Sequence, residues 1–235
     1  MSKTIFSDFD GTLTDNGHMS AVFFELLAVL QSKNLNLIIV SGRSLSWGHF
    51  LLTHFPLTNC IMEGGGTLSS VINGNIVDRV LIDDASVKRL EDVTATLKAM
   101  QGVVLSTDSF GRHTDRALEF KLMSQEKLKE VEDLFVFKNI NFSYSNVHLN
   151  FWAGDLSKFK AVEMFAKENS ISLEDSIYFG DALNDQSMFK SFKVSVGVSN
   201  IKPFLSQMVD KPSIILEGEE NKEIAGVVNY IRKFY

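Results

Sequence analysis

The sequence predicts an α/β protein in which an α+β insertion interrupts a doubly wound, Rossmann-like parallel sheet. Strand-like apolar runs alternate with helix-like patterns near both ends of the 235 residues, as in a parallel sheet covered by helices. The middle of the chain instead carries a hairpin signal, and hairpins belong to antiparallel sheets. Hydrophobic residues make up 45% and charged residues 22%, which are the proportions of a packed globular protein.

Polar residues follow three of the predicted strands at the point where each strand ends. These strands and the residues after them are 3–7 before Asp8-Phe9-Asp10-Gly11-Thr12, 35–40 before Ser41-Gly42-Arg43, and 176–179 before Gly180-Asp181-Ala182-Leu183-Asn184-Asp185. Ligands of open parallel sheets bind beyond the carboxyl ends of the strands. The three segments therefore predict one shared site.

Further elements complete the predicted sheet. A largely buried helix is expected at about 20–32, where Val22, Leu26 and Leu30 recur at helical spacing. Two short strands are expected at 194–197 and 213–216, followed by a final helix. The apolar face of that helix is made of Ile224, Val227, Val228 and Ile231.

The middle of the chain is predicted to form a separate α+β unit. Its first feature is a hairpin, with strands at 67–72 and 75–82 around the turn Asn73-Gly74. Two helices are expected, one with Val87, Leu90, Thr94 and Leu97 at helical spacing and one with Leu128, Val131 and either Leu134 or Phe135. They alternate with strands at 117–122, 141–144 and 147–152. We therefore divide the chain into a core of residues 1–65 and 155–235 and an inserted domain of residues 66–154.

Charge and cysteine content exclude several classes of protein. The formal charge of −6 argues against a nucleic-acid surface, and the longest apolar runs are far shorter than a membrane helix. The single Cys60 forms no internal disulfide, and no secretory signal precedes Asp8, so we expect a cytoplasmic protein. Zinc is not expected, because the histidines lack ligand spacing. The sequence does not predict the oligomeric state.

The acidic residues of the first and third polar segments suggest a magnesium site. Asp8 and Asp10 are two apart, so they share one side if the strand continues through them. A hard divalent cation such as Mg²⁺ relieves the repulsion between such carboxylates, and Gly11 lets the backbone turn beside it. On spacing alone a surface turn is an equal alternative. The distant Asp181 and Asp185 make the metal site the more specific interpretation.

Taken together, these motifs resemble those of the haloacid dehalogenase superfamily of phosphoryl-transfer enzymes. Asp8 to Thr14, Ser41-Gly42-Arg43, Lys158 and Gly180 to Asp185 are similar to its four motifs, in the same order. The insertion between the second and third motifs resembles the α+β cap of the Cof-like and sugar-phosphatase branch.

The resemblance implies a role for each matching residue. Asp8 is implied as the nucleophile that becomes an aspartyl phosphate, and Asp10 as the residue that protonates the leaving oxygen and later activates water. The implied Mg²⁺ ligands are Asp8, Asp10, Asp181 and Asp185, with Asp185 as a ligand or as a holder of the others. The implied substrate and phosphate contacts are Thr12, Ser41, Gly42, Arg43, Lys158 and Asn184.

Several assignments keep an alternative. Lys160 competes with Lys158, which we favour because it stands at the start of a helix. Arg43 either braces its loop or touches phosphate. The segment 111–116 either contacts a sugar or carboxylate substrate, through His113 or Arg116, or is a solvated loop. The run Gly64-Gly65-Gly66 is either a hinge for the cap or a tight connection.

We therefore expect a Mg²⁺-dependent phosphatase that acts on a small phosphorylated metabolite, with a sugar phosphate as the favoured substrate. A mutase of the phosphomannomutase type is the nearest alternative, but its second motif typically differs from Ser41-Gly42-Arg43. A phospho-acceptor switch or a silent binding protein is a weaker alternative. Receiver domains are about half this length and have no cap, and every acid that the chemistry needs is present.

Overall fold

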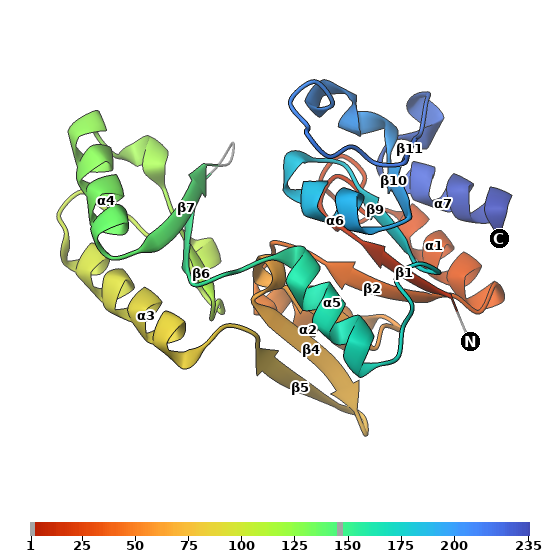
Figure 1. Ribbon diagram of the computed structural model, residues 1–235, viewed down its shortest axis with the longest axis horizontal. Helices are drawn as coiled ribbons and strands as arrows, with labels where there is room; N and C mark the ends of the chain where they lie inside the picture. The colour runs from red at the N-terminus through yellow and green to blue at the C-terminus, as the bar shows by residue number, and fades with distance from the viewer. Residues whose placement is uncertain (1–2, 145–147) are drawn as a thin grey trace.

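The computed structural model describes residues 3–144 and 148–235 and consists of two lobes (Figure 1). In the described part of the chain, the larger lobe contains an eight-stranded sheet. Its order is β11 (Ile214–Ile215), β10 (Val194–Gly197), β9 (Ile177–Gly180), β1 (Thr4–Ser7), β2 (Asn36–Val40), β3 (Asn59–Met62), β4 (Thr67–Ile72) and β5 (Asn75–Val80). The strands from β11 to β3 are parallel, which confirms the predicted Rossmann-like core.

Helices cover both faces of this sheet, because its central strands are apolar on both sides. Successive residues of β1 alternate between two hydrophobic cores, with Ile5 in one and Phe6 in the other. The first core is closed by α1 (Ala21–Ser32), α2 (Leu45–His54) and α7 (Glu223–Phe234), and the second by α5 (Lys158–Glu168) and α6 (Gln186–Ser191). This doubly wound arrangement fixes the strand ends that carry the polar residues.

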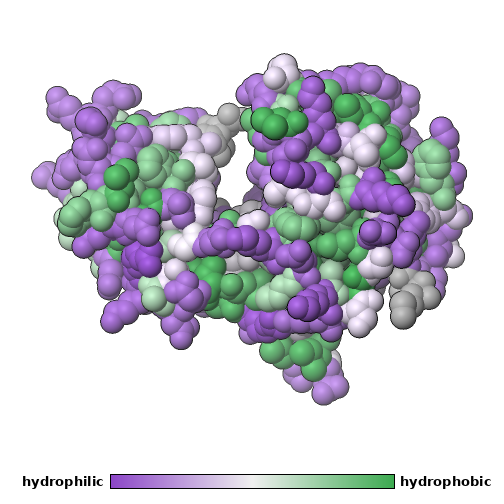
Figure 2. Space-filling model, viewed as in Figure 1, coloured by the Kyte–Doolittle hydropathy of each residue, from purple (hydrophilic) through white to green (hydrophobic). Residues whose placement is uncertain are grey.

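The smaller lobe has its own antiparallel sheet and core. The strand order is β6 (Asp115–Leu118), β8 (Leu149–Ala153) and β7 (Ile140–Tyr144), and the helices are α3 (Asp84–Ala99) and α4 (Gln125–Phe137). Leu90, Phe135 and Phe151 lie in the core between sheet and helices. The space-filling view shows a notch between this lobe and the upper part of the larger one (Figure 2).

The hairpin at 67–80 lies in the main sheet and not in the smaller lobe, where the sequence analysis placed it. Strand β4 pairs antiparallel with β3, so the hairpin extends the core sheet by two strands. Local pattern predicts that two strands pair with each other but not which sheet they join. The division at residues 66 and 154 thus separates β4 and β5 from the sheet to which they are hydrogen-bonded.

Other predicted elements of the middle segment need smaller corrections. The strand predicted at 117–122 ends at Leu118, and Phe120–Leu122 forms a 3₁₀ turn. The strand predicted at 147–152 is described from Leu149, and Val147 lies outside the described residues. The helix α2 and the strand β3 had not been predicted.

The two lobes meet in a tight connection at the glycine run. A Cβ atom on Gly65 would lie 2.3 Å from the backbone oxygen of Ser157, and one on Gly66 would lie 1.8 Å from Oγ1 of Thr114. A larger residue at position 65 would have to move the backbone at Ser157, and one at position 66 would have to move the side chains of Thr114 and Leu156. Of the two interpretations of this run, the structure favours close packing. Among residues 3–144 and 148–235, no helix combines the length and apolarity needed to cross a bilayer.

Candidate active site

The carboxyl ends of β1, β2 and β9 bring the three predicted polar segments together. Strand β1 lies between β2 and β9 in parallel register, so the residues after each strand meet at one edge of the sheet. Lys158 joins them from the first turn of α5, where Ser157 caps the helix. Residues far apart in the sequence therefore face one another at this edge.

Lys158 is the cation at the centre of this cluster. Its Nζ donates to Oδ1 of Asp8 at 2.7 Å and to Oδ1 of Asp185 at 2.9 Å, and all three side chains are buried. The alternative Lys160 is exposed and pairs with Asp155 instead. Of the two lysines, the structure therefore brings only Lys158 to the acidic cluster.

Asp181 is held by two uncharged side chains. Thr12 Oγ1 donates to its Oδ1 at 3.1 Å, and Asn200 Nδ2 donates to its Oδ2 at 3.0 Å. Asn200 also donates to the backbone oxygen of Gly11, at 2.9 Å. The turn after β1 and the turn after β9 are thereby joined through Asn200.

Gly11 is required where these two turns touch. Its φ of +77° is a conformation that only glycine adopts readily, and a Cβ atom there would lie 2.3 Å from Oδ2 of Asp181. The glycine of the first motif therefore makes room for the carboxylate of the fourth.

Asp10 lies outside the buried cluster and pairs with Arg43. The guanidinium donates from Nε and NH2 to the two carboxylate oxygens, and it also lies over the ring of Trp47 at 4.7 Å. This geometry favours the bracing interpretation of Arg43. Of the other predicted phosphate contacts, Ser41 is buried, whereas Gly42 and Asn184 are both exposed.

Burial and an excess of negative charge raise the pKa values of the buried acids. Burial is the main cause for Asp8, whose pKa is raised to about 7 despite the opposing charge of Lys158. Burial, with the charges of Asp8 and Asp185, raises the pKa of Asp181 to about 8. Burial alone would lower the pKa of Lys158, but Asp185 and Asp8 outweigh it and raise that pKa.

The donor set fits a hard divalent cation. Asp8, Asp181 and Asp185 each offer a carboxylate oxygen, and these oxygens lie within 4.8 Å of one another. Three buried carboxylates face one buried lysine, so further positive charge would stabilise their ionised forms. Oxygen ligands of this kind suit Mg²⁺.

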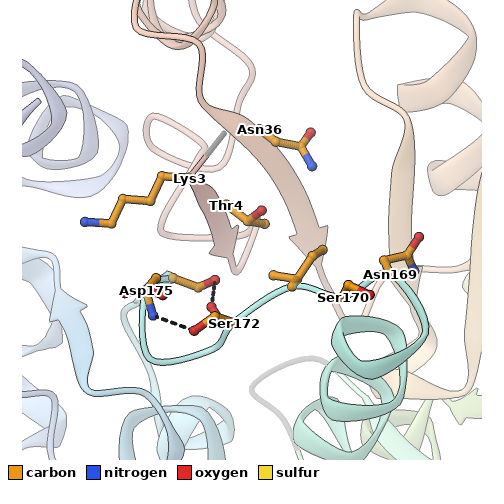
Figure 3. Close-up of a pocket in the computed structure, with 9 residues that line it drawn as sticks. Lys3, Thr4, Asn36, Asn169, Ser170, Ser172 and Asp175 are labelled. Atoms are coloured by element: carbon orange, nitrogen blue, oxygen red, sulfur yellow. Dashed lines mark hydrogen bonds between the residues drawn. The ribbon is translucent and has the colours of Figure 1, made fainter. Parts of the chain in front are cut away.

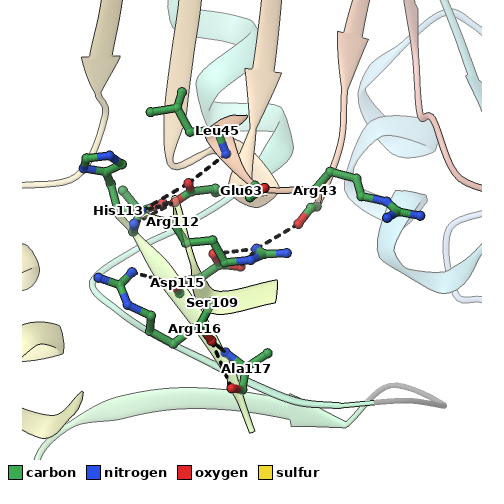
Figure 4. A network of polar contacts seen from close by, with 12 residues as sticks. Arg43, Leu45, Glu63, Ser109, Arg112, His113, Asp115, Arg116 and Ala117 are labelled. Carbon is green, nitrogen blue, oxygen red and sulfur yellow. Dashed lines mark hydrogen bonds and ion pairs between the residues drawn. The ribbon is translucent and has the colours of Figure 1, made fainter. Parts of the chain in front are cut away.

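A second polar network joins the smaller lobe to the loops beside this site (Figure 4). Glu63 is fully buried and accepts hydrogen bonds from the backbone N–H groups of Leu45, His113 and Thr114 and from Thr114 Oγ1. Arg112 NH1 donates to the backbone oxygen of Gly42 at 3.0 Å and to Asp115. The predicted 111–116 cluster is therefore a lobe junction and not a solvated loop.

A large cavity lies elsewhere in the described structure. It measures about 620 Å³ and is lined by residues that include Lys3, Thr4, Asn36 and Asp175 (Figure 3). Thr4 begins β1 whereas Asp8 follows its end, so this cavity is at the opposite edge of the sheet from the acidic cluster. The acidic cluster, and not this cavity, carries the chemistry of the candidate active site.

Three residues of the site region had not been predicted from the sequence. Tyr178 donates to Asp185 from the interior of β9, Asn200 holds Asp181, and Glu63 holds the lobe junction. The sequence gives a weak signal for two of them, because Glu63 directly precedes the glycine run and Asn200 follows the strand β10.

Comparison with known proteins supports the same interpretation of the motifs. A family model described as haloacid dehalogenase-like hydrolase matches residues 5–139 and 117–231. These matches span nearly the whole chain, including all four motif segments.

Relatives and solved structures cover the chain over most of its length. A phosphoglycolate phosphatase of Nitrosopumilus maritimus is 30% identical over 85% of this chain and 85% of its own length. A phosphoglycolate phosphatase of Methanobrevibacter smithii is 24% identical, over 86% and 88%. The structure of a haloacid dehalogenase-like hydrolase from Bacteroides thetaiotaomicron has a TM-score of 0.74 at 18% identity, covering 98% of this chain and 100% of that one.

Proposed function

This chain belongs to the haloacid dehalogenase-like hydrolase family, and from that premise we propose that it is a Mg²⁺-dependent phosphatase acting on a small phosphomonoester. The observation that carries the proposal is the contact between Lys158 and Asp8 inside the buried acidic cluster. A carboxylate nucleophile needs positive charge around it when it approaches a phosphate group. Lys158 supplies part of that charge, and a bound cation would supply the rest.

The proposed reaction has two displacements at phosphorus. An oxygen of Asp8 attacks phosphorus, the bond to the leaving oxygen breaks, and Asp10 gives that oxygen a proton. Water then attacks the phosphorus of the aspartyl phosphate, Asp10 takes the proton from the water, and phosphate leaves with Asp8 restored. Asp10 gives up a proton in the first step and regains one in the second, so the protons balance over the two steps.

The other site residues are proposed to hold the phosphate group and the metal. Mg²⁺, when bound, supplies charge that neutralises the phosphoryl oxygens. Asp8, Asp10 and Asp181 would hold it, with Asp185 as a ligand or as a holder of the others. Lys158, Ser41 and the Gly42 amide would contact the phosphoryl oxygens, with Thr12, Arg43 and Asn184 around them.

Two substrate classes are candidates. The sequence favoured a sugar phosphate, and the names of two relatives add phosphoglycolate, a small phosphorylated acid. We propose that the substrate is a small phosphorylated metabolite, and the single Cys60, which is free and buried, supports a cytoplasmic location.

The test is turnover by the purified protein with Mg²⁺ over a panel of phosphorylated sugars, phosphoglycolate, glycerates and nucleotides. Released phosphate and isomerised sugar phosphate are both measured, since a mutase forms only the second. We expect phosphate release that a chelator stops and that Asp8→Asn lowers at least about a thousandfold. An Asp8→Asn protein that works at the original rate would show that the nucleophile is wrong.

A further inference from the structure

Tyr178 is a buried tyrosine whose hydroxyl reaches the acidic cluster from inside the sheet. It lies in the middle of β9 and is fully buried, with its ring against Phe189 and Phe192. Its OH donates to Oδ1 of Asp185 at 2.6 Å. Within the described residues, this is the one hydrogen bond that the hydroxyl makes. A hydroxyl buried in an apolar core is therefore aimed at the acidic cluster.

The carboxylate of Asp185 is fully used by its neighbours. Oδ1 accepts from Tyr178 and from Lys158, and Oδ2 accepts from the backbone N–H groups of Asp181 and Ala182, at 3.1 and 3.2 Å. A carboxylate has about four lone-pair positions, so the donors described here fill it. Asp185 is thus held in one orientation by the strand, the helix α5 and its own loop.

The two oxygens of Asp185 serve different parts of the site. Through Oδ1 it holds Lys158, whose Nζ contacts Asp8. Through Oδ2 it holds the turn that carries Asp181. The orientation of Asp185 therefore sets the position of Lys158, which contacts the proposed nucleophile, and of Asp181, a proposed metal ligand.

We propose that Tyr178 is a positioning residue for this site, which locks Asp185 as the anchor of Lys158 and of the Asp181 turn. The hydrogen-bonding positions of Asp185 are filled, and among the described residues the Tyr178 hydroxyl has no other partner. A phenylalanine would fill the same space but leave Oδ1 with Lys158 alone.

The test compares Tyr178→Phe with Tyr230→Phe, a matched control. Tyr230 is also a buried tyrosine beside β9, but its ring packs on Phe179 on the other face of the sheet. Mg²⁺ binding is measured by calorimetry, together with kcat and KM. We expect Tyr178→Phe to weaken Mg²⁺ binding and to lower kcat by about tenfold each, the size of one hydrogen bond to a charged group, with KM nearly unchanged. Tyr230→Phe should match the wild type.

A double-mutant cycle identifies the route of the effect. Tyr178→Phe should change the free energy of unfolding much less in an Asp185→Asn background than in the wild-type background, because the two residues act as one unit. Additive effects, or Mg²⁺ affinity and kcat of Tyr178→Phe within about twofold of the wild type, would overturn the proposal.

Two further readouts keep the test decisive. If Tyr178→Phe does not fold, the hydroxyl proton of Tyr178 in the wild-type protein is followed by NMR. It should be protected from exchange and should shift in Asp185→Asn, and a rapidly exchanging proton would contradict the proposal.

The kinetic part rests on the proposed function, whereas Mg²⁺ binding does not. A protein that binds Mg²⁺ but hydrolyses no phosphomonoester would refute the function and leave Tyr178 to be decided by affinity.

Discussion

Arg43 holds the carboxylate of Asp10 with two hydrogen bonds, from Nε to Oδ2 at 2.8 Å and from NH2 to Oδ1 at 2.6 Å. The pair is partly exposed, with 35% and 43% of the two side chains accessible to solvent, so a substrate can reach it. The guanidinium of Arg43 also lies over the ring of Trp47. The carboxylate of Asp10, the proposed acid and base of the reaction, is therefore held in one orientation by the loop after β2.

Arg43→Lys is expected to lower kcat about tenfold while leaving the free energy of unfolding within about 0.5 kcal/mol of the wild type, because lysine cannot reproduce a two-pronged contact and half-exposed pairs contribute little stability. Steady-state kinetics and urea unfolding check this. Arg79→Lys is the control, since Arg79 makes a similar two-pronged pair with Glu168 away from the acidic cluster. Equal kcat in the Arg43 variant and the wild type would contradict the proposed bracing.

Gly11→Ala is expected to remove Mg²⁺-dependent activity by at least about a hundredfold, because the new methyl group would displace the Asp181 carboxylate. The control is Gly17→Ala. Gly17 has the same kind of backbone, with φ of +78°, but a Cβ atom there meets nothing within 4 Å. Both variants should lose about 1 kcal/mol of stability from the backbone, and only the first should lose activity. Comparable activities in the two variants would refute the crowding argument.

Glu63→Ala is expected to destabilise the protein by at least about 3 kcal/mol, since it leaves the buried donors of Leu45 and Thr114 and the part-buried N–H of His113 without an acceptor. The measurement is urea unfolding, with Glu163→Ala as the control because Glu163 is an exposed residue of α5. A loss below about 1 kcal/mol would mean that the lobe junction is held by other contacts.

The raised pKa of Asp115 is expected to lower the free energy of unfolding as the pH rises. Burial raises its pKa from 3.8 to about 7, with Glu63 adding to this and Arg112 and Arg116 opposing it. The folded protein therefore binds more protons than the unfolded chain between about pH 4 and 7, so the free energy of unfolding decreases across that range and this contribution is constant above it. Asp115→Asn should flatten the slope. Unfolding at pH 5 and at pH 8 measures the difference, and parallel pH profiles would disprove it.

The strand-end pattern predicted the position of the site because it depends on local sequence alone. A buried parallel strand is a continuous apolar run, and the first polar residue after it marks the carboxyl edge, which is how Asp8 and Asp181 were recognised together. The same logic placed Ser41. It did not identify the sheet that the 67–80 hairpin joins, because strand partners outside a hairpin are set by tertiary packing.

Tyr178 and Asn200 show what local pattern leaves out. A tyrosine in a buried strand satisfies the apolar pattern whether or not its hydroxyl has a partner, and Asp185 becomes its partner only after the turn following β9 has folded back. Asn200 lies after β10, and its contact with Gly11 spans 189 residues. Polar contacts of this kind follow from the fold and not from spacing.

The central position of β1 has a consequence for synthesis on the ribosome. The first strand can pair with β2 early, but its other edge is completed only by β9, and the acidic cluster gains its last members from residues after 180. A nascent chain must therefore keep its opening aspartates and one open strand edge without their partners until most of the polypeptide has emerged. We expect truncated translation products to lack the proposed metal site and to be cleared or to aggregate through that edge.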